Sequence, residues 1–392
     1  MQTFLGVNMF KKILSTLAIG CAFGCSFWAC DSGAGTMPTE TSTVSKAIPV
    51  DYTLGRTMNA ILGRGINLGN SWESEGPDDG AWSNPIRDTD FAVIKAAGFN
   101  SVRIPVRWQF GSDYSTHTVD PNRLNGVLNH IRLAIANGLA VVVNFHHYVE
   151  LNCAGGGGNS NGTKCAYSPS KYETEKAHFL ALWAQVATAM GEFRDDQVVL
   201  EILNEPIIPN VTLVDQLMNE AYTVIRKYAP GKTIMFETYH AAKFGEIATL
   251  HLPQDGNIIF SGHYYEPYTY SHQGHGYECK GDAAMASTAD EDMEYYAGLA
   301  YKYYPDVNGV DQIPLNMGEF GIAGGDPSPC QWQQGEGPST SNKAYWAAKA
   351  AKAAVKNGMS FHYWGFGQTG GFDAYNTGTE EWYPGFPDAL IF

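Results

Sequence analysis

Short apolar runs alternate with longer helix-periodic segments along the chain from residue 52 onward. The runs are rich in aliphatic and β-branched residues and cover residues 65–68, 101–106, 140–145, 198–203, 233–236, 258–262, 314–317 and 359–363. Continuous apolar runs of this length predict strands that are buried on both faces, as in a parallel sheet.

Six segments with helical spacing of apolar residues lie between these runs. They cover residues 89–97, 122–137, 173–193, 213–228, 290–304 and 340–357. Gly98, Gly138 and Gly358 directly follow three of them, and glycine is typical of the position just past a helix end. Alternating strands and helices predict parallel strands joined by crossovers. Eight strands, with no G-x-G-x-x-G fingerprint after the first, favour a single (β/α)8 TIM barrel over an open doubly wound sheet.

The N-terminal segment is set apart by its composition. Lys11 and Lys12 precede an uncharged apolar run over residues 13–28, which is shorter than the roughly 20 residues that a membrane helix needs. We therefore predict a signal peptide over residues 1–29. Cys30 follows directly and resembles the lipidated first residue of a bacterial lipoprotein. The protein is thus expected to be secreted or to be a lipoprotein of the cell envelope, with a retained membrane anchor as the alternative.

Residues 30–47 are rich in Ser, Thr, Gly and Pro, which predicts a flexible tether, and residues 48–392 then form one domain. An exported protein reaches an oxidising compartment, where cysteines form disulfides. Three pairings of the four cysteines in the predicted domain are possible. Two of these cysteines bracket a Gly-rich loop, so we favour the pairs Cys153–Cys165 and Cys279–Cys330.

Composition excludes several functions. The 40 acidic and 25 basic side chains give a net charge of −15, and no Lys/Arg-rich block is present, which argues against nucleic acid as a partner. The sequence has no P-loop, no dinucleotide fingerprint and no C-x-x-C pair, so we expect neither a cofactor nor a metal. The 19 Phe, 22 Tyr and 9 Trp residues suggest flat surfaces for flat ligands such as sugars. We expect a monomer that meets a membrane only through the N-terminal lipid.

Polar residues collect where the predicted strands end. In a parallel barrel the active site lies at the carboxyl ends of the strands. The residues in these places are Asn67, Asn70, Arg103, His146, His147, Asn204, Glu205, Glu237, His263, Tyr265, Glu319 and Trp364. Their repeated placement predicts one site that is shared by several strands.

Glu205 and Glu319 follow the fourth and seventh strands, which lie nearly opposite each other in a barrel. Two facing carboxyl groups suit hydrolysis of a glycosidic bond, because one must protonate the leaving oxygen while the other, ionised, attacks the anomeric carbon or activates water. We expect Arg103 to hold Glu319 ionised and the Tyr265 hydroxyl to fix its rotamer. Asn204 is expected to bind the sugar 2-hydroxyl.

The histidines admit a second interpretation, as metal ligands. His146 and His147 are adjacent on one strand and point to opposite sides, so they do not suit one ion. His263, His272 and His275 form a looser set, with Cys279 close behind, for which we favour a hydrogen-bond network. His146 and His263 are expected to bind sugar hydroxyls or to steady the carboxylates.

Trp364 ends the eighth strand and is the predicted platform for a sugar ring in the central subsite. Further platforms, with loop packing as the equal alternative, are Trp72, Trp82, Trp108, Trp332 and Trp382.

Seven motifs in order resemble glycoside hydrolase family 5, the cellulase family of retaining (β/α)8-barrel glycosidases. They are RGINLGN (64–70), VRIPV (102–106), NFHHY (144–148), LEILNEP (200–206), HYY (263–265), MGEFG (317–321) and Trp364. They span nearly the whole predicted domain, and residues 266–274 resemble bacterial endoglucanase-like members of the family.

The resemblance implies that Glu205 is the acid/base and Glu319 the nucleophile of a double displacement with retention. It also implies a set of supporting and substrate-binding residues, namely Arg103, His146, Asn204, His263, Tyr265 and Trp364. The chain has Asn144 where the family often has Asp, but this position does not carry the proton.

The leading hypothesis is therefore an endo-acting β-1,4-glucanase whose partner is a β-glucan polysaccharide. A mannanase, a xyloglucanase or a mixed-linkage β-glucanase would use the same catalytic pair, as would a transglycosylase. A surface lipoprotein that binds glycans on an aromatic groove without catalysis is the alternative from a different class.

Overall fold

The computed structural model describes residues 47–159, 162–324, 330 and 335–392. The predicted signal peptide, the lipidation candidate Cys30 and all but the last residue of the predicted tether lie outside the described residues. Within the described part of the chain, no helix is both long and apolar enough to span a membrane.

Eight parallel strands form a closed barrel whose order around the circle follows the sequence. The strands are β1 (Arg64–Asn67), β2 (Ser101–Ile104), β3 (Ala140–Asn144), β4 (Val198–Glu201), β5 (Thr233–Phe236), β6 (Ile258–Tyr264), β7 (Leu315–Phe320) and β8 (Ser360–Tyr363). The last strand pairs with the first, which closes the barrel. The predicted (β/α)8 barrel is therefore confirmed.

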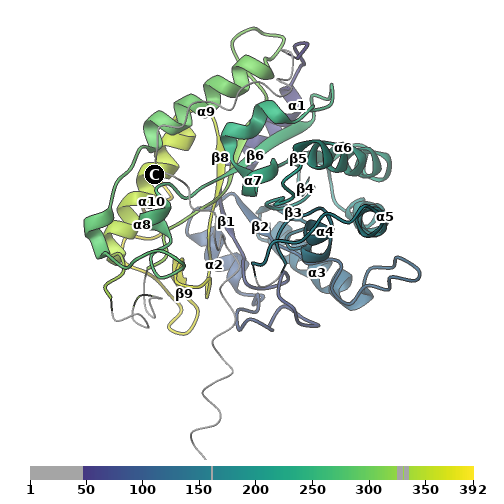
Figure 1. Ribbon diagram of the computed structural model, residues 1–392. Coiled ribbons are helices and arrows are strands. Elements are labelled where there is room, and N and C mark those ends of the chain that lie inside the picture. The colour runs from purple at the N-terminus through teal and green to yellow at the C-terminus, as the bar shows by residue number, and fades with distance from the viewer. Residues whose placement is uncertain (1–46, 160–161, 325–329, 331–334) are drawn as a thin grey trace, which may run out of the picture.

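Helices surround the strands, as Figure 1 shows. The helices between strands are α2 (Asp90–Ala96), α3 (Pro121–Ala136), α5 (Pro169–Met190), α6 (Val211–Tyr228), α9 (Ala289–Tyr303) and α10 (Thr340–Lys356). The connections also contain α4 (Val149–Ala154), α7 (Tyr239–Ala242), η1 (Phe244–Thr249), α8 (Tyr268–Ser271) and η2 (Gly281–Ala284). After the barrel, β9 (Tyr375–Asn376) and β10 (Glu381–Trp382) pair antiparallel. The helical shell buries the outer faces of the strands, which explains why the strands are apolar on both sides.

Helix α1 (Thr53–Leu62) covers one end of the barrel, and the sequence pattern does not predict it. Its Met58 and Leu62 form a buried cluster with side chains from β3, β4, β5 and β6. Gly55 interrupts the helical pattern, because this position must stay small: an added Cβ would lie 2.4 Å from the carbonyl oxygen of Ile258. The helix can thus lie directly against the start of β6.

Strands β6 and β7 extend beyond the apolar runs that predict them. These runs end at Gly262 and Met317, whereas the strands continue to Tyr264 and Phe320. After a register shift next to Gly262, His263 is paired with Glu319 on the neighbouring strand. His263 and Glu319 are therefore held by the sheet itself. Because both residues are polar, they lie beyond the apolar runs from which the strands are predicted.

Two disulfides tie loops that follow barrel strands. Cys153 is bonded to Cys165 in the connection after β3. Cys279 is bonded to Cys330, which joins the connection after β6 to the one after β7. The structure thus has the pairing that the sequence favoured, and both bonds lie on the side of the barrel where the strands end.

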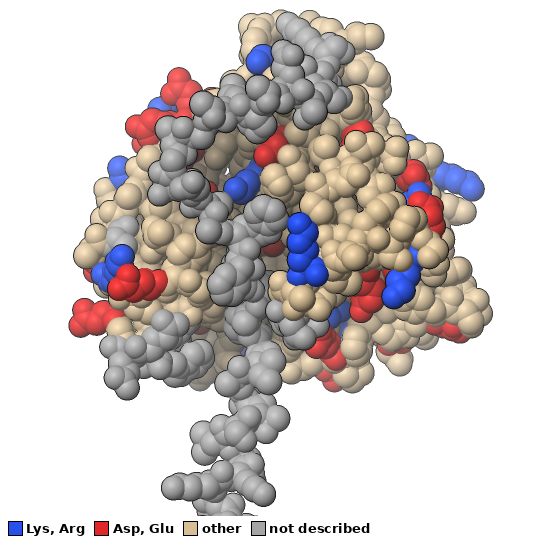
Figure 2. Space-filling model, in the orientation of Figure 1, with Lys and Arg blue, Asp and Glu red and all other residues tan. Residues whose placement is uncertain are grey.

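Acidic and basic side chains are interspersed on the face shown in Figure 2. A nucleic-acid site needs a continuous positive stripe that follows the phosphates. The described residues of this face show no such stripe.

Truncation of Leu62 tests the role of α1. We expect Leu62→Ala, which leaves a cavity at a fully buried position, to lower the free energy of unfolding by about 2–5 kcal/mol. The control is Leu54→Ala on the same helix, where the side chain is 64 % exposed and the change should stay within about 0.5 kcal/mol. Urea unfolding measures both, and equal losses for the two variants would contradict the packing described.

Candidate active site

Arg103 of β2 connects side chains from across the barrel. Its side chain is fully buried, and its Nε and Nη2 donate to Glu201 at 2.8 and 2.6 Å. Its Nη1 donates to Glu319 Oε1 at 2.8 Å and to Asn67 Oδ1 at 2.9 Å. Its Nη2 also donates to Asn204 Oδ1 at 2.6 Å. One guanidinium thus fixes side chains that belong to or follow β1, β4 and β7.

Glu201 of β4 holds Arg103 by two hydrogen bonds, and Glu201 is not among the site residues expected from the sequence. The expected ion pair of Arg103 with Glu319 is present, and Arg103 forms a second ion pair with Glu201. Asn144 Nδ2 also donates to Glu201 Oε1 at 2.8 Å. Burial favours the neutral acid, but the charge of Arg103 outweighs burial and lowers the pKa of Glu201. The only signal in the sequence is one charged residue at the end of an apolar strand.

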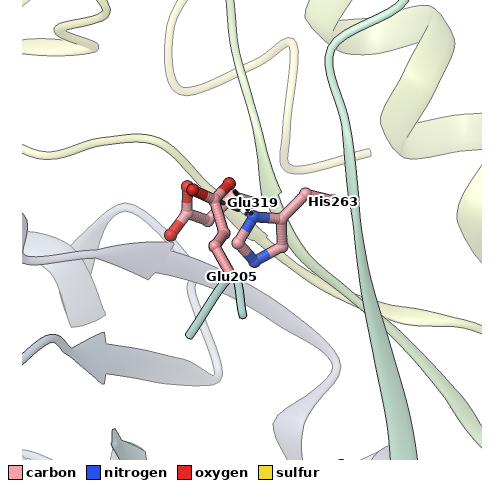
Figure 3. A group of neighbouring side chains, drawn as sticks. All are labelled: Glu205, His263 and Glu319. Carbon is pink, nitrogen blue, oxygen red and sulfur yellow. Dashed lines mark hydrogen bonds and ion pairs between the residues drawn. The ribbon is translucent and has the colours of Figure 1, made fainter. Parts of the chain in front are cut away.

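Glu205, His263 and Glu319 form a compact cluster, and Figure 3 shows the imidazole ring facing the two carboxyl groups. His263 Nδ1 donates to Glu205 Oε1 at 2.8 Å and lies 3.6 Å from Glu319 Oε2. One oxygen of each carboxyl group and one ring nitrogen all lie within 4.8 Å of one another. The Tyr265 hydroxyl donates to Glu319 Oε2 at 2.9 Å. These four residues were all expected at the site, and the structure brings them together.

The members of this cluster differ in exposure and charge. The Glu205 side chain is 27 % exposed, whereas that of Glu319 is 7 % and that of His263 only 1 %. Burial raises the pKa of Glu319, and the positive charges of His263 and Arg103 oppose that shift. Burial lowers the pKa of His263, but the carboxylates of Glu319 and Glu237 outweigh it and raise the pKa well above its usual value.

The same cluster presents three atoms at a spacing that could suit a metal ion. His263, however, directs Nδ1 to Glu205 and Nε2 to Glu237, at 2.8 and 3.0 Å. A doubly protonated imidazole has no lone pair to offer a metal. The arrangement therefore suits proton transfer better than metal binding.

Trp364 follows β8, is half-buried and packs against a small apolar cluster that contains Tyr265. Its ring stacks on that of His146, with the ring centroids 5.6 Å apart and the planes at 4°. A Cβ at Gly69 would lie 2.5 Å from the indole ring, so any larger residue there would displace it. Trp364 thus has a fixed orientation at the carboxyl end of the barrel, as a sugar platform requires.

The prediction of a sugar platform is wrong for two of the other tryptophans, Trp72 and Trp108. Trp72 is 6 % exposed and donates to His130, and Trp108 is fully buried and donates to the Asn144 carbonyl. Both indole rings fill the core, where an N–H group needs a partner. The other three tryptophans differ in position. Trp82 is half-exposed, and its ring centroid lies 6.0 Å from that of His147. Trp382 packs on Phe99 and Tyr375, and Trp332 lies outside the described residues.

The remaining histidines serve hydrogen bonds and packing. His146 is buried, and burial together with nearby positive charges lowers its pKa well below the usual value, so that it is neutral. His272 packs on Tyr265, and His275 contacts the Gly370 carbonyl at 2.8 Å. Cys279 is in a disulfide and offers no thiolate. The favoured network therefore describes this set better than a metal site does.

The cellulase family, glycosyl hydrolase family 5, matches residues 62–370. The chain belongs to this family. The matched stretch contains all eight barrel strands and every polar side chain of the cluster around Arg103. The family resemblance carried by the seven motifs is therefore confirmed.

Several relatives of this family member are similar over most of its length. Endoglucanase H of Acetivibrio thermocellus is 25 % identical, over 80 % of this chain and 30 % of that protein. Endoglucanase A of Clostridium longisporum is 25 % identical, over 89 % of this chain and 65 % of that protein. The chain thus spans less than two thirds of the length of either relative.

Among solved structures, Thermotoga maritima Cel5A with mannotriose is 28 % identical, with a TM-score of 0.70. That match covers 86 % of this chain and 100 % of the other. A second structure of the same protein, with cellobiose, has a TM-score of 0.69 at 28 % identity over the same shares of the two chains. Both agree with the barrel described here.

Removal of the Glu201 charge tests the weight of the buried ion pair. We expect Glu201→Gln to lower the free energy of unfolding by about 3–5 kcal/mol, because a buried guanidinium loses its bidentate partner. The matched control is Glu192→Gln, which breaks a pair with Arg132 whose side chains are 44 % and 48 % exposed; that loss should be at most about 1 kcal/mol. Denaturant unfolding at neutral pH gives both values, and equal effects would mean that Glu201 is not the main counter-ion.

Proposed function

We propose that the protein is an endo-acting retaining β-glycosidase that hydrolyses β-1,4-glucan chains by double displacement. The observation that supports this most directly is the approach of Glu205 and Glu319 to within 4.8 Å, oxygen to oxygen. Retaining glycosidases hold their carboxyl groups about 5–5.5 Å apart, whereas inverting ones need about 6.5–9.5 Å to admit a water molecule. The spacing therefore favours direct attack by a carboxylate.

In the first step, Glu319 attacks the anomeric carbon as the ionised carboxylate. Arg103 and Tyr265 donate to different oxygens of this group, which stabilises its charge and orients it. Glu205 simultaneously passes a proton to the glycosidic oxygen, and the bond from that oxygen to the anomeric carbon breaks. Because Glu205 Oε1 accepts from His263, its other oxygen carries the proton. The products are a shortened chain and a covalent glycosyl–enzyme.

In the second step, the roles of the carboxyl groups change. Glu205, now ionised, takes a proton from a water molecule, and the resulting oxygen nucleophile attacks the anomeric carbon. The ester bond to Glu319 breaks, and the sugar leaves with its original configuration. The partial exposure of Glu205 suits a group that must meet a leaving group and then water.

Asn204 and Trp364 supply the contacts with the sugar in this proposal. Asn204 Oδ1 accepts from Arg103, which fixes the amide, and we assign its nitrogen to the sugar 2-hydroxyl, a contact that strengthens in the transition state. The Trp364 ring is the platform for the sugar at the site of cleavage. His146 supports that ring from behind.

The choice of β-1,4-glucan as substrate rests on the relatives. The two matched relatives are named endoglucanases, and the similar Thermotoga protein has structures with both cellobiose and mannotriose. A mannanase, a xyloglucanase and a mixed-linkage β-glucanase would use the same catalytic pair.

We also propose that the protein is exported and is lipidated at Cys30. Fractionation of cells that carry the parent protein or a Cys30→Ala variant tests this proposal, since loss of the lipid should release the protein from the membrane fraction.

A substrate panel tests the proposed activity. We expect release of reducing ends from carboxymethylcellulose, lichenan, glucomannan and xyloglucan, with the soluble β-1,4-glucan cut at internal positions so that its viscosity falls early. A faster rate on glucomannan or xyloglucan would move the assignment to one of the alternatives. Longer products from oligosaccharide donors would indicate a transglycosylase, and binding without any cleavage would indicate a glycan-binding lipoprotein.

Glu319→Gln tests the assigned nucleophile. We expect kcat to fall by at least about 10⁴-fold while the affinity for cello-oligosaccharides remains, because the amide cannot form the covalent intermediate. Proton NMR of the first product released by the parent should show the retained β-anomer. An inverted first product would exclude Glu319 as nucleophile, and so would full activity of the variant.

A further inference from the structure

A fourth glutamate lies beneath the catalytic cluster and has no part in the proposed reaction. Glu237 follows β5 directly, and its side chain is fully buried. Its Oε2 accepts the backbone N–H of Glu205 at 2.8 Å. Its Oε1 lies 3.0 Å from His263 Nε2. One carboxyl group thus contacts both the main chain of Glu205 and the imidazole that binds the Glu205 side chain.

The Glu205 backbone needs such a contact. Its φ is 45°, in the left-handed region that residues with a Cβ rarely adopt. The Glu237 carboxylate accepts the N–H of that strained residue and stabilises the turn. The turn directs the Glu205 side chain toward His263 and Glu319, as Figure 3 shows.

His263 is held between carboxyl groups on both of its ring nitrogens. A carboxylate oxygen only accepts hydrogen bonds, so a ring nitrogen that faces it must carry a proton. The Glu205 oxygen that faces Nδ1 is an acceptor, because the proton of this acid is on the other oxygen, and an ionised Glu237 accepts from Nε2. These two contacts together favour the imidazolium, in agreement with the raised pKa of His263. Its positive charge then lies 3.6 Å from Glu319 Oε2.

We propose that Glu237 is a positioning residue for the double displacement: it holds the Glu205 turn and keeps His263 doubly protonated, so that a positive charge stays between the two catalytic carboxyl groups. This inference rests on the proposed function. Glu237 touches neither the substrate nor the reacting atoms, and it acts through Glu205 and His263.

The groups that face Glu237 agree with this role. His263 lies on β6, Arg103 of β2 comes within 3.8 Å, and Glu201 of β4 adds a negative charge from the third side. Burial raises the pKa of Glu237 to about 7, and the charge of His263 opposes that shift. The carboxylate therefore depends on the imidazolium, and the imidazolium on the carboxylate.

Glu237→Gln keeps the size of the side chain and removes its charge. The amide has one oxygen, which can face either the Glu205 N–H or His263 Nε2. The amide NH2 group then faces the other of the two. The Glu205 N–H can only donate, whereas His263 Nε2 can lose its proton and accept. We therefore expect the variant to keep the turn and to convert His263 to a neutral tautomer.

Loss of the imidazolium changes the pH profile in a defined direction. Glu319 must be ionised to attack, and the positive charge beside it favours ionisation. Without that charge the pKa of Glu319 rises, and the acid limb of kcat/KM moves to higher pH by about one unit. The rate below the limb then falls about tenfold, while near the new optimum the variant keeps most of its activity. The charge removed at position 237 acts in the opposite direction, but Glu237 faces Nε2 of the ring, whereas Glu319 lies beside Nδ1.

Glu73→Gln is the matched control. Glu73 is buried, burial raises its pKa to about 7, and its charge also acts on Glu319. It accepts from the backbone N–H groups of Asn70 and Ser71, however, and not from His263. Loss of this negative charge should leave the acid limb in place or move it to lower pH.

A Glu237→Gln profile that coincides with that of the parent would overturn the inference, and so would a shift to lower pH. Neither result touches the proposed function, which is tested separately by the substrate panel, by Glu319→Gln and by the anomer of the first product. The parent offers a second measurement that needs no folded variant at position 237. Nitrogen NMR of its histidines, with His263→Gln used for assignment, should show His263 doubly protonated above pH 7. A neutral His263 at that pH would exclude the role assigned to Glu237.

Discussion

The burial of one guanidinium determines how the rest of the site is built. Arg103 has no exposed surface, and a charge removed from water must be compensated by partners with good geometry. Its donors reach Glu201, Glu319, Asn67 and Asn204, which come from different parts of the barrel. The strands cannot shift their register at this end without breaking at least one of these bonds. The ion therefore converts a generic barrel into one with a fixed arrangement of carboxyl groups.

The charges around Arg103 also explain why one glutamate of the site is partly exposed to solvent while the others are buried. Glu201, Glu237 and Glu319 are almost completely buried, and Arg103 and His263 supply two positive charges against them. Burial raises the pKa of both Glu237 and Glu319, because a low-dielectric site holds excess negative charge poorly. A proton that must move during a reaction is best placed where water and ligand can reach it. Glu205 alone among these glutamates has that access.

The sequence predicts the barrel and the outer members of the site, because both are patterns that repeat. Eight apolar runs alternate with helices, and polar residues at their ends fall on the same side of a parallel barrel. Glu201 has no such pattern, because it is a single carboxylate inside an apolar run. Glu237 is one of the strand-end residues, but the pattern does not indicate its partners, and only the packed structure shows that both glutamates face Arg103. Helix α1 is not predicted from the sequence for a related reason. Gly55 allows the helix to lie close to β6, but a glycine at this position weakens the helical pattern. The tryptophans show the opposite error, in which a loop position suggested exposure, yet Trp108 is fully buried.

Asn144 shows how the charge network and the sugar platform depend on each other. Its Oδ1 accepts from the Val106 N–H, and its Nδ2 donates to Glu201. An aspartate here would place another buried carboxylate against Glu201, whose charge Arg103 already compensates. The neutral amide also contacts His146 Nδ1 at 3.3 Å, and the neutral His146 ring supports Trp364. The departure from the aspartate that the family often has is therefore consistent with this site, because the amide satisfies the strand end, the buried glutamate and the platform without adding charge.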